Sequence, residues 1–198
     1  MTEASYPPLE DCNERTALAV ITSAFVDDPV ERWLYPDESY QRDFPRFVHA
    51  LGGKAIDERT AWCWSDQHAV ALWLPPEVTP DDETLLDVLT TTVAATNHVD
   101  MFTCLEQMAQ AHPTEPHWYL AWLAVDPGAQ GRGLGARLLA RCLATVDASH
   151  QPAYLETPNP RTIPFYERHG FTTTGHTQAG SCPPITFMHR PARPLTKD

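Results

Sequence analysis

The spacing of apolar residues along the chain changes near residue 115. Before that point most apolar residues recur every three or four positions, which is the period of an amphipathic helix. After it, short continuous apolar runs of strand length alternate with amphipathic runs. The first half therefore predicts helices around a single pair of strands, and the second half predicts strands and helices in alternation within one α/β domain.

The first half predicts five helices and one hairpin. Helical spacing of apolar residues marks the segments 13–26, 30–35, 40–51, 81–95 and 100–111. Two short runs rich in Trp and Val, 61–65 and 69–74, lie three residues apart and predict a β-hairpin. The pair Gly52-Gly53 follows the third helix, and we expect it to end that helix.

The second half predicts two helices, 134–146 and 163–169, and strands at 117–125, 153–157, 171–175 and 185–189. Nearly every residue of the first of these strands is apolar, so we expect it to be buried on both faces. Helix 134–146 is expected to direct an apolar side toward the core, formed by Leu138, Leu139, Cys142 and Val146.

A glycine-rich turn joins the first of these strands to the helix that follows it. The segment 130–136 places glycine at Gly131, Gly133 and Gly135. Backbone N–H groups of such a turn can point at one anion, and the helix N-terminus adds a partial positive charge. The turn therefore predicts a ligand that carries a pyrophosphate.

Composition and charge narrow the class of protein. The chain has 198 residues, of which 42% are hydrophobic and 20% charged, as in a globular domain. Asp and Glu number 26 against 14 Lys and Arg, a net charge of −12 without a basic run, which argues against nucleic-acid binding. An acidic surface mildly favours a cationic partner such as an amine.

The cysteines and the termini bear on the cellular setting. Five widely spaced cysteines form no C-x-x-C pair, which indicates reduced thiols rather than disulfides or a zinc site. The first residues lack the apolar core of a signal peptide, and no run of 18 apolar residues is present. We therefore expect a cytoplasmic protein that needs neither a metal nor a membrane.

Two interpretations of the glycine turn compete. The segment 131–136 fits G-x-G-x-x-A, a dinucleotide-binding pattern, and Glu156 lies about 20 residues further on, where that pattern places a ribose-binding acid. A dinucleotide fold needs several more strand–helix units, however, and only one follows here. This interpretation is therefore disfavoured.

The second interpretation joins the turn to a later motif. The pattern Q-x-x-G-x-G over 130–135 is followed by N-x-x-x-x-x-F-Y-x-x-x-G-F over 159–171. Together they resemble the GNAT superfamily of acetyl-CoA-dependent N-acetyltransferases. The resemblance extends from Trp118 to about His189 and is weak in the first half. It is greatest to puromycin N-acetyltransferase-like members, in the residues 115–121, 154–157 and 160–168.

The resemblance implies a fold and a binding mode for acetyl-CoA. The fold would be a mixed, mostly antiparallel sheet flanked by helices, in which the strands 117–125 and 153–157 splay apart. The pantetheine arm would pair with the first strand like an added strand, Asn159 would bond the arm, and the pyrophosphate would rest on the turn. The implied acetyl-CoA ligands are Leu123, Ala124, Val125, Gln130, Gly131, Arg132, Gly133, Leu134, Gly135, Ala136, Asn159 and Tyr166.

The resemblance also implies catalytic roles. Tyr166 matches the family's general acid, which protonates the leaving thiolate, as a phenol with a pKa of ~10 can do. Many members carry a glutamate on the strand before the turn as general base, but 117–125 has no acid. Glu156 is the best local candidate, with His117 or a chain of waters as alternatives.

The expected function is transfer of an acetyl group to a primary amine of a small molecule, by direct attack in a ternary complex. The whole chain would be one domain, with acceptor-side helices and a hairpin over 1–112 and an acetyl-CoA-binding half over 113–190, acting as a monomer or homodimer. Acidic and aromatic side chains of the first half would line the acceptor pocket: Asp27, Asp28, Trp33, Tyr35, Trp62, Trp64 and Trp73. A non-catalytic acyl-CoA-binding module and acetylation of a peptide amine remain alternatives.

Overall fold

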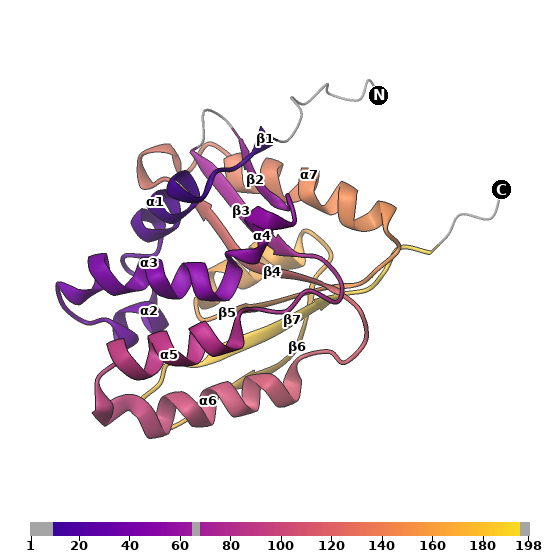
Figure 1. Cartoon of the computed structure of the whole chain (residues 1–198). Coiled ribbons are helices and arrows are strands. Elements are labelled where there is room, and N and C mark those ends of the chain that lie inside the picture. Colours follow the sequence, from indigo (N-terminus) through magenta and orange to yellow (C-terminus); the bar gives the residue numbers. More distant parts are fainter. Residues whose placement is uncertain (1–9, 65–67, 195–198) are drawn as a thin grey trace.

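The computed structural model describes residues 10–64 and 68–194 and contains one seven-stranded sheet in the order β1-β2-β3-β4-β5-β7-β6 (Figure 1). All neighbouring strands are antiparallel except β4 and β5, which are parallel. The predicted mixed, mostly antiparallel sheet is confirmed. The strands are β1 (Glu10–Asp11), β2 (Ala61–Trp64), β3 (Ala69–Leu74), β4 (Trp118–Val125), β5 (Ala153–Thr157), β6 (Thr172–Thr177) and β7 (Ile185–Arg190).

Helices cover both faces of the sheet. The helices from the first half pack on one face and α7 packs on the other (Figure 1). None of the helices in the described part of the chain is long and apolar enough to cross a bilayer. The helices are α1 (Glu14–Ala24), α2 (Pro29–Leu34), α3 (Ser39–Gly52), α4 (Lys54–Asp57), α5 (Asp82–Thr92), α6 (His98–Ala111), α7 (Leu134–Ala148) and α8 (Ile163–Glu167).

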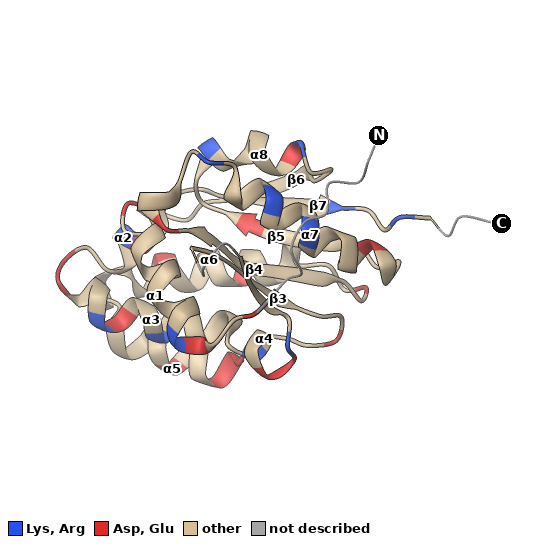
Figure 2. Cartoon of the chain, turned by 90° about the horizontal axis from the view of Figure 1, so that it is seen from above, with Lys and Arg blue, Asp and Glu red and all other residues tan. Residues whose placement is uncertain are grey.

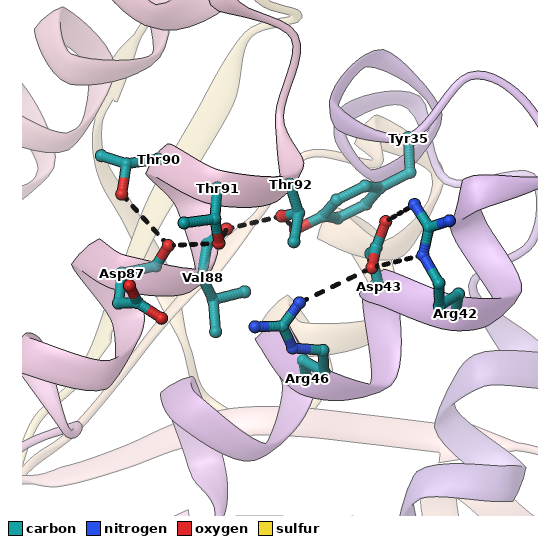
Figure 3. Close-up of polar contacts among 9 residues, drawn as sticks. All are labelled: Tyr35, Arg42, Asp43, Arg46, Asp87, Val88, Thr90, Thr91 and Thr92. Atoms are coloured by element: carbon teal, nitrogen blue, oxygen red, sulfur yellow. Dashed lines mark hydrogen bonds and ion pairs between the residues drawn. The ribbon is translucent and has the colours of Figure 1, made fainter.

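Side-chain caps fix where the helices of the first half begin. The Asn13 side chain accepts a hydrogen bond from the Thr16 N–H and starts α1, and Asp81 does the same for α5. At the far end of α2 the Tyr35 hydroxyl lies 3.2 Å from the Thr92 hydroxyl of α5, beside an ion pair between Asp43 and Arg42 (Figure 3). The five helices predicted for the first half are all present, and their ends differ from the prediction by a few residues.

The expectation that Gly52-Gly53 ends the third helix is confirmed, since α3 ends at Gly52 and Gly53 is its C-cap. Gly53 has a right-handed φ of −62°, and the chain runs directly into α4, which the sequence pattern did not predict. Gly52 is also required for packing. A Cβ at this position would lie 2.7 Å from Cδ1 of Trp122, so glycine lets α3 approach β4 closely.

Acidic and basic positions both occur along the outer helices, including α3 and α4 (Figure 2). One ion pair is largely buried. Arg190 of β7 makes contacts of 2.5 and 3.1 Å with both oxygens of Asp147 at the end of α7, and its Nε donates to the His169 carbonyl oxygen. This pair ties the second half of the sheet to α7.

The second half follows the predicted order, and β5 has the predicted bounds. Four residues of α7 predicted to face the core are completely buried, and Pro164 lies in the first turn of α8. His117 falls one residue outside β4. Ser65, at the end of the predicted first hairpin strand, lies outside the described residues.

The parallel strands β4 and β5 pair only at their beginnings. The recorded partners are Trp118 with Ala153 and Tyr119 with Tyr154, and no further pairs follow along the described strands. On its other side β4 pairs with β3, where Leu72 faces Trp122 and Trp73 faces Leu120, so Ala121 is an extra residue. Such a β-bulge bends a strand, and it sits where β4 leaves β5. The separation opens a gap at one edge of β4.

Candidate functional site

A cavity of about 930 Å³ lies where β4 and β5 separate. Its wall combines the outer half of β4, the glycine turn, the end of β5, α8 and parts of α1, α2, α5 and α6. Segments far apart in the sequence therefore meet at one site. Among the predicted site residues, the cavity is lined by Leu123, Ala124, Val125, Gln130, Gly131, Gly133, Leu134, Gly135, Ala136, Glu156, Asn159 and Tyr166.

The glycine turn has the geometry of an anion cradle. Gly131 and Gly133 both have φ of +75°, a left-handed conformation that L side chains rarely adopt, and a Cβ on either would meet nothing within 4 Å. Gly133 caps α7 without a side-chain hydrogen bond, so the first N–H groups of this helix are left for a ligand. These features fit the pyrophosphate of coenzyme A.

The outer half of β4 offers backbone groups to a ligand. Its hydrogen bonds to β3 extend as far as Val125, whereas its pairing with β5 stops at Tyr119. The Gln130 side chain donates a 3.1 Å hydrogen bond to the Val125 carbonyl oxygen and thereby ties the turn to the strand. Backbone groups on the edge that faces the cavity are placed to pair with the amides of a pantetheine arm.

Two of the implied acetyl-CoA ligands carry local hydrogen bonds. The Asn159 Oδ1 accepts from the Arg161 N–H at 3.1 Å and shapes the turn after β5, so its amide nitrogen is the group free to face the cavity. Arg132 does not line the cavity. It is exposed, and its guanidinium lies 3.4 Å from the Gly128 carbonyl oxygen. Its predicted contact with phosphates stays a prediction.

Tyr166 of α8 lines the cavity beside the glycine turn. Its ring packs edge-on against Phe165 and Phe171 at centroid distances of 5.1 and 5.9 Å. Burial, and to a smaller extent the Asp28 carboxyl, raises the pKa of Tyr166 above its ordinary value. The phenol therefore stays protonated at neutral pH, as a proton donor must.

Glu156 lies near the end of β5 and faces the helices of the first half. The Tyr119 hydroxyl donates a 2.7 Å hydrogen bond to Glu156 Oε2, and His112 Nδ1 lies 3.7 Å from Oε1. Burial and the Glu156 charge raise the pKa of Tyr119 well above its ordinary range, so this hydroxyl stays a donor. Glu156 is thus oriented by two groups while it lines the cavity.

A pair of histidines connects Glu156 to the surface. His112 Nε2 and His117 Nε2 lie 3.0 Å apart, and His117 Nδ1 lies 2.7 Å from the Glu115 carbonyl oxygen. Because a carbonyl only accepts, His117 Nδ1 carries a proton, and neutral His117 accepts from His112. Burial lowers the pKa of His117, which favours this neutral form. His117 does not line the cavity, which makes it a neighbour of the site.

Two further carboxyl groups line the cavity at the start of α2. Asp28 caps the helix by accepting from the Val30 and Glu31 N–H groups at 3.0 and 3.4 Å. Burial raises the pKa of Asp28 to about 6, and burial together with Asp28 raises the pKa of Glu31 well above its ordinary value. Asp28 was among the predicted acceptor residues, and Glu31, three residues further along the same helix, was missed.

The predicted aromatic wall is only partly correct. Asp27 and Trp33 line the cavity, and Tyr35 is fully buried in the core. The prediction is wrong for Trp62, Trp64 and Trp73, which pack on the opposite face of the sheet against α7. The alternation of side chains along β2 and β3 sends these three residues to one face and Cys63 and Leu72 to the other.

The side of the cavity formed by the first-half helices is mostly apolar. It is lined from α1, α5, α6 and β4 by Phe25, Leu85, Leu89, Met101, Met108 and Trp122, among others. Helical spacing predicted Phe25, Leu85 and Leu89 as apolar residues of helices, and nothing in the sequence marks them as cavity residues. Within the described residues, no group of three or more His, Cys, Asp or Glu is arranged to hold a metal ion.

The fold and the site together define a class. Residues 91–173 match the family model of the acetyltransferase (GNAT) domain. Enzymes of this class are acyltransferases that use acetyl-CoA as the co-substrate. The match covers the glycine turn and the motif that contains Tyr166.

One relative by sequence is also an acetyltransferase. A segment of 62 residues is 45% identical to the mycothiol acetyltransferase of Beutenbergia cavernae, and the match covers 29% of this chain and 21% of that protein. The chain thus matches about one fifth of the length of this relative.

Solved structures support the fold over nearly the whole chain. A Corynebacterium glutamicum structure described as histone acetyltransferase HPA2 and related acetyltransferase superposes with a TM-score of 0.66 at 22% identity, covering 96% of this chain and 99% of the other. Arylalkylamine N-acetyltransferase 2 of Aedes aegypti gives a TM-score of 0.64 at 12% identity, covering 94% and 99%. At these identities the similarity concerns the fold.

Proposed function

We propose that this chain transfers an acetyl group from acetyl-CoA to a primary amine of a small molecule by direct attack in a ternary complex. The observation that carries the proposal is that one cavity holds the glycine turn, the open edge of β4, Tyr166 and Glu156. A donor bound along β4 and an acceptor bound against the first-half helices would meet there. This arrangement assigns residues 113–190 to the donor and residues 1–112 mainly to the acceptor within a single domain.

Each catalytic group has a defined task in this proposal. The amine must lose a proton before its nitrogen can attack, and Glu156 receives that proton. The nitrogen then bonds to the carbonyl carbon of the acetyl group, and the bond from that carbon to sulfur breaks. Tyr166 gives its proton to the departing thiolate. The products are the N-acetyl amine and coenzyme A, and solvent exchange restores both side chains.

The histidine pair offers a route for the proton that Glu156 receives. His112 Nδ1 faces Glu156 at 3.7 Å, and the opposite nitrogen of the same ring reaches His117 at 3.0 Å. His112 is itself partly exposed, so it can release the proton to water at the surface while its bond to neutral His117 holds the ring in place. Glu156 can return to its charged form in this way without opening the cavity to bulk water.

The acceptor class follows from the apolar wall and from the similarity to enzymes of amines. The arylalkylamine N-acetyltransferase of Aedes aegypti shares the fold, and its name specifies an apolar amine. The likeness to puromycin N-acetyltransferase-like members in the motifs around Glu156 and Tyr166 favours the same kind of acceptor. A long apolar surface with acidic groups at one end suits an amine with an aromatic body.

The experiment is release of coenzyme A thiol from acetyl-CoA with three acceptors: 2-phenylethylamine, puromycin and a short peptide with a free N-terminus. We expect amine-dependent release with one or both small molecules and none with the peptide. Release with the peptide alone would assign a peptide amine as acceptor. Binding of coenzyme A without release with any amine would indicate a non-catalytic binding module.

A further inference from the structure

The cavity contains two buried carboxyl groups that the transfer step does not use. Asp28 is 7% and Glu31 is 4% exposed, and both line the cavity. Glu31 Oε2 has no hydrogen-bond partner among the described residues, and Asp28 bonds only to backbone N–H groups of its own helix. A buried carboxyl group without a partner favours its neutral form, and a cation that binds from the cavity is the partner that would stabilise the ionised form of this pair.

Nearby arginines do not supply that partner. Arg32 donates to the Pro36 carbonyl oxygen and lies over the Tyr40 ring, 5.4 Å from its centroid. Arg42 and Arg46 both pair with Asp43 on α3 (Figure 3). Within the described residues no ion pair to Asp28 or Glu31 is formed.

The charges around the pair are mainly negative or neutral. Asp27 is the residue before Asp28, and burial, with a smaller contribution from Asp28 or Glu31, raises the pKa of the phenols of Tyr35, Tyr40 and Tyr166. A phosphate or carboxylate ligand would be repelled here. A cation is the only kind of charged group that this corner of the cavity favours.

We propose that Asp28 and Glu31 form a cation-binding site that receives the acceptor as its protonated amine, next to an apolar wall that holds the body of the molecule. The proposal rests on the proposed function, because it assigns the acceptor of the same cavity. Trp33 lines the same corner and can face an ammonium group with its ring. The site thus selects amines that are cations at neutral pH over neutral molecules of the same shape.

The position of the pair also separates the two substrates. The phosphates of the donor are expected at the N-terminus of α7, whereas Asp28 and Glu31 lie at the start of α2. Asp28 and Glu31 line the same cavity as Tyr166, which is proposed to protonate the departing thiolate. A protonated amine held there is close to the reaction centre before its proton leaves.

The experiment compares two probes of nearly equal shape, 2-phenylethylamine, which is a cation at pH 7, and 2-phenylethanol, which is neutral. Calorimetry in the presence of coenzyme A measures both affinities for the wild-type chain, for the Asp28→Asn, Glu31→Gln double variant and for Glu83→Gln. Asparagine retains the helix cap, so the double variant keeps α2. Glu83 is exposed on α5, does not line the cavity and serves as the charge-matched control.

We expect the wild-type chain and Glu83→Gln to bind the amine at least tenfold more tightly than the alcohol. The double variant should bind the two probes equally, with its affinity for the alcohol unchanged. The cation site is overturned if the wild-type chain lacks this preference, which includes the case in which it binds neither probe. It is also overturned if a folded double variant keeps the preference. Thermal melts of each variant establish that it is folded.

The two proposals fail in different ways. If the chain binds the ammonium probe selectively but releases no thiol, the cation site stands and this amine is excluded as an acetyl acceptor. If the double variant acetylates the amine with an unchanged KM, the transferase proposal stands and the cation site is excluded. A rise in KM with little change in kcat is the result expected for a binding role.

Discussion

The Tyr119 hydroxyl donates a 2.7 Å hydrogen bond to Glu156 across the point where β4 and β5 begin to separate. The two residues belong to different parallel strands, and their bond lies two residues beyond the last strand pair on β5. It therefore fixes the direction of the Glu156 carboxyl at the inner end of the cavity. A base held in a fixed orientation is what proton transfer from a bound amine requires.

Glu156→Gln should lower kcat by roughly 10²–10⁴-fold, because glutamine retains the bond to Tyr119 but cannot take a proton. Coenzyme A affinity should stay unchanged, since the phosphate end of the cavity is untouched. Thiol release and calorimetry measure the two quantities. Tyr119→Phe is the companion variant, and it should reduce kcat less because the carboxyl is still present. A wild-type rate in Glu156→Gln would assign the base to another group.

Tyr166→Phe should lower kcat for an amine acceptor by roughly 10²-fold while the ring packing against Phe165 and Phe171 is retained. The loss should be smaller with an acyl donor whose leaving thiol is more acidic, because that thiolate needs less help from an acid. Phe165→Leu, which alters the same cluster without removing a hydroxyl, controls for packing. An unchanged rate in Tyr166→Phe would exclude the phenol as the proton donor.

The glycine turn makes a prediction about ligand-induced stability. Coenzyme A at 100 times its dissociation constant should add ~2.7 kcal/mol to the wild-type chain, a rise in Tm of roughly 5–10 °C. Gly133→Ala should lose most of this rise, because alanine disfavours φ of +75° and shifts the first N–H groups of α7. Gly128→Ala is the control, since its φ is not left-handed. A full shift in Gly133→Ala would show that the turn does not hold the phosphates.

The glycine turn and the motif around Tyr166 could be located in the sequence because their signals are local. The glycines at Gly131 and Gly133, the strand before them and the motif around Tyr166 each lie within one short stretch of chain, so spacing alone locates them. The separation of β4 and β5 was implied by the resemblance to the family. Its physical cause, the extra residue Ala121, depends on the register with β3 and leaves no mark in the sequence of β4 itself.

The cavity wall formed by the first-half helices could not be predicted to the same degree, because it depends on the face of its element that each residue occupies. Trp62 and Trp73 have the composition of a binding wall, yet strand alternation turns them toward α7. In the sequence Glu31 resembles an ordinary surface residue of a short helix, and only the packing of α2 against the cavity buries it. Gly52 has its role only because Trp122, distant in the sequence, lies against it. Each of these facts requires the tertiary arrangement.

Glu31 gives a prediction about pH and stability. Its pKa in the folded chain lies above that of an unfolded glutamate, ~4.3, so the unfolded state loses its proton first as the pH rises. The stability linked to this group is present below pH ~4.3 and decreases as the pH increases toward the folded pKa. Asp28 acts in the same direction up to a pH of about 6. Glu31→Gln should therefore lose less stability than the wild type between pH 4.5 and 7 in urea unfolding. If the free energy of unfolding changes equally with pH in Glu31→Gln and in the wild type, the Glu31 carboxyl does not have a raised pKa. Glu83→Gln is the control and should follow the wild type.

Two ion pairs of different burial should differ in their contribution to stability. The Arg190 and Asp147 side chains are 8% and 16% exposed, whereas Arg59 and Asp11 are 79% and 58% exposed. Asp147→Ala leaves the buried guanidinium with only the His169 carbonyl oxygen as its partner, which should cost about 3 kcal/mol. Asp11→Ala should cost about 0–1 kcal/mol, because water solvates the exposed Arg59. Urea unfolding of the two variants measures both values at the same pH and salt concentration. If Asp147→Ala loses no more stability than Asp11→Ala, the contact between α7 and β7 does not depend on this ion pair. The apolar residues around the pair would then hold the end of the sheet.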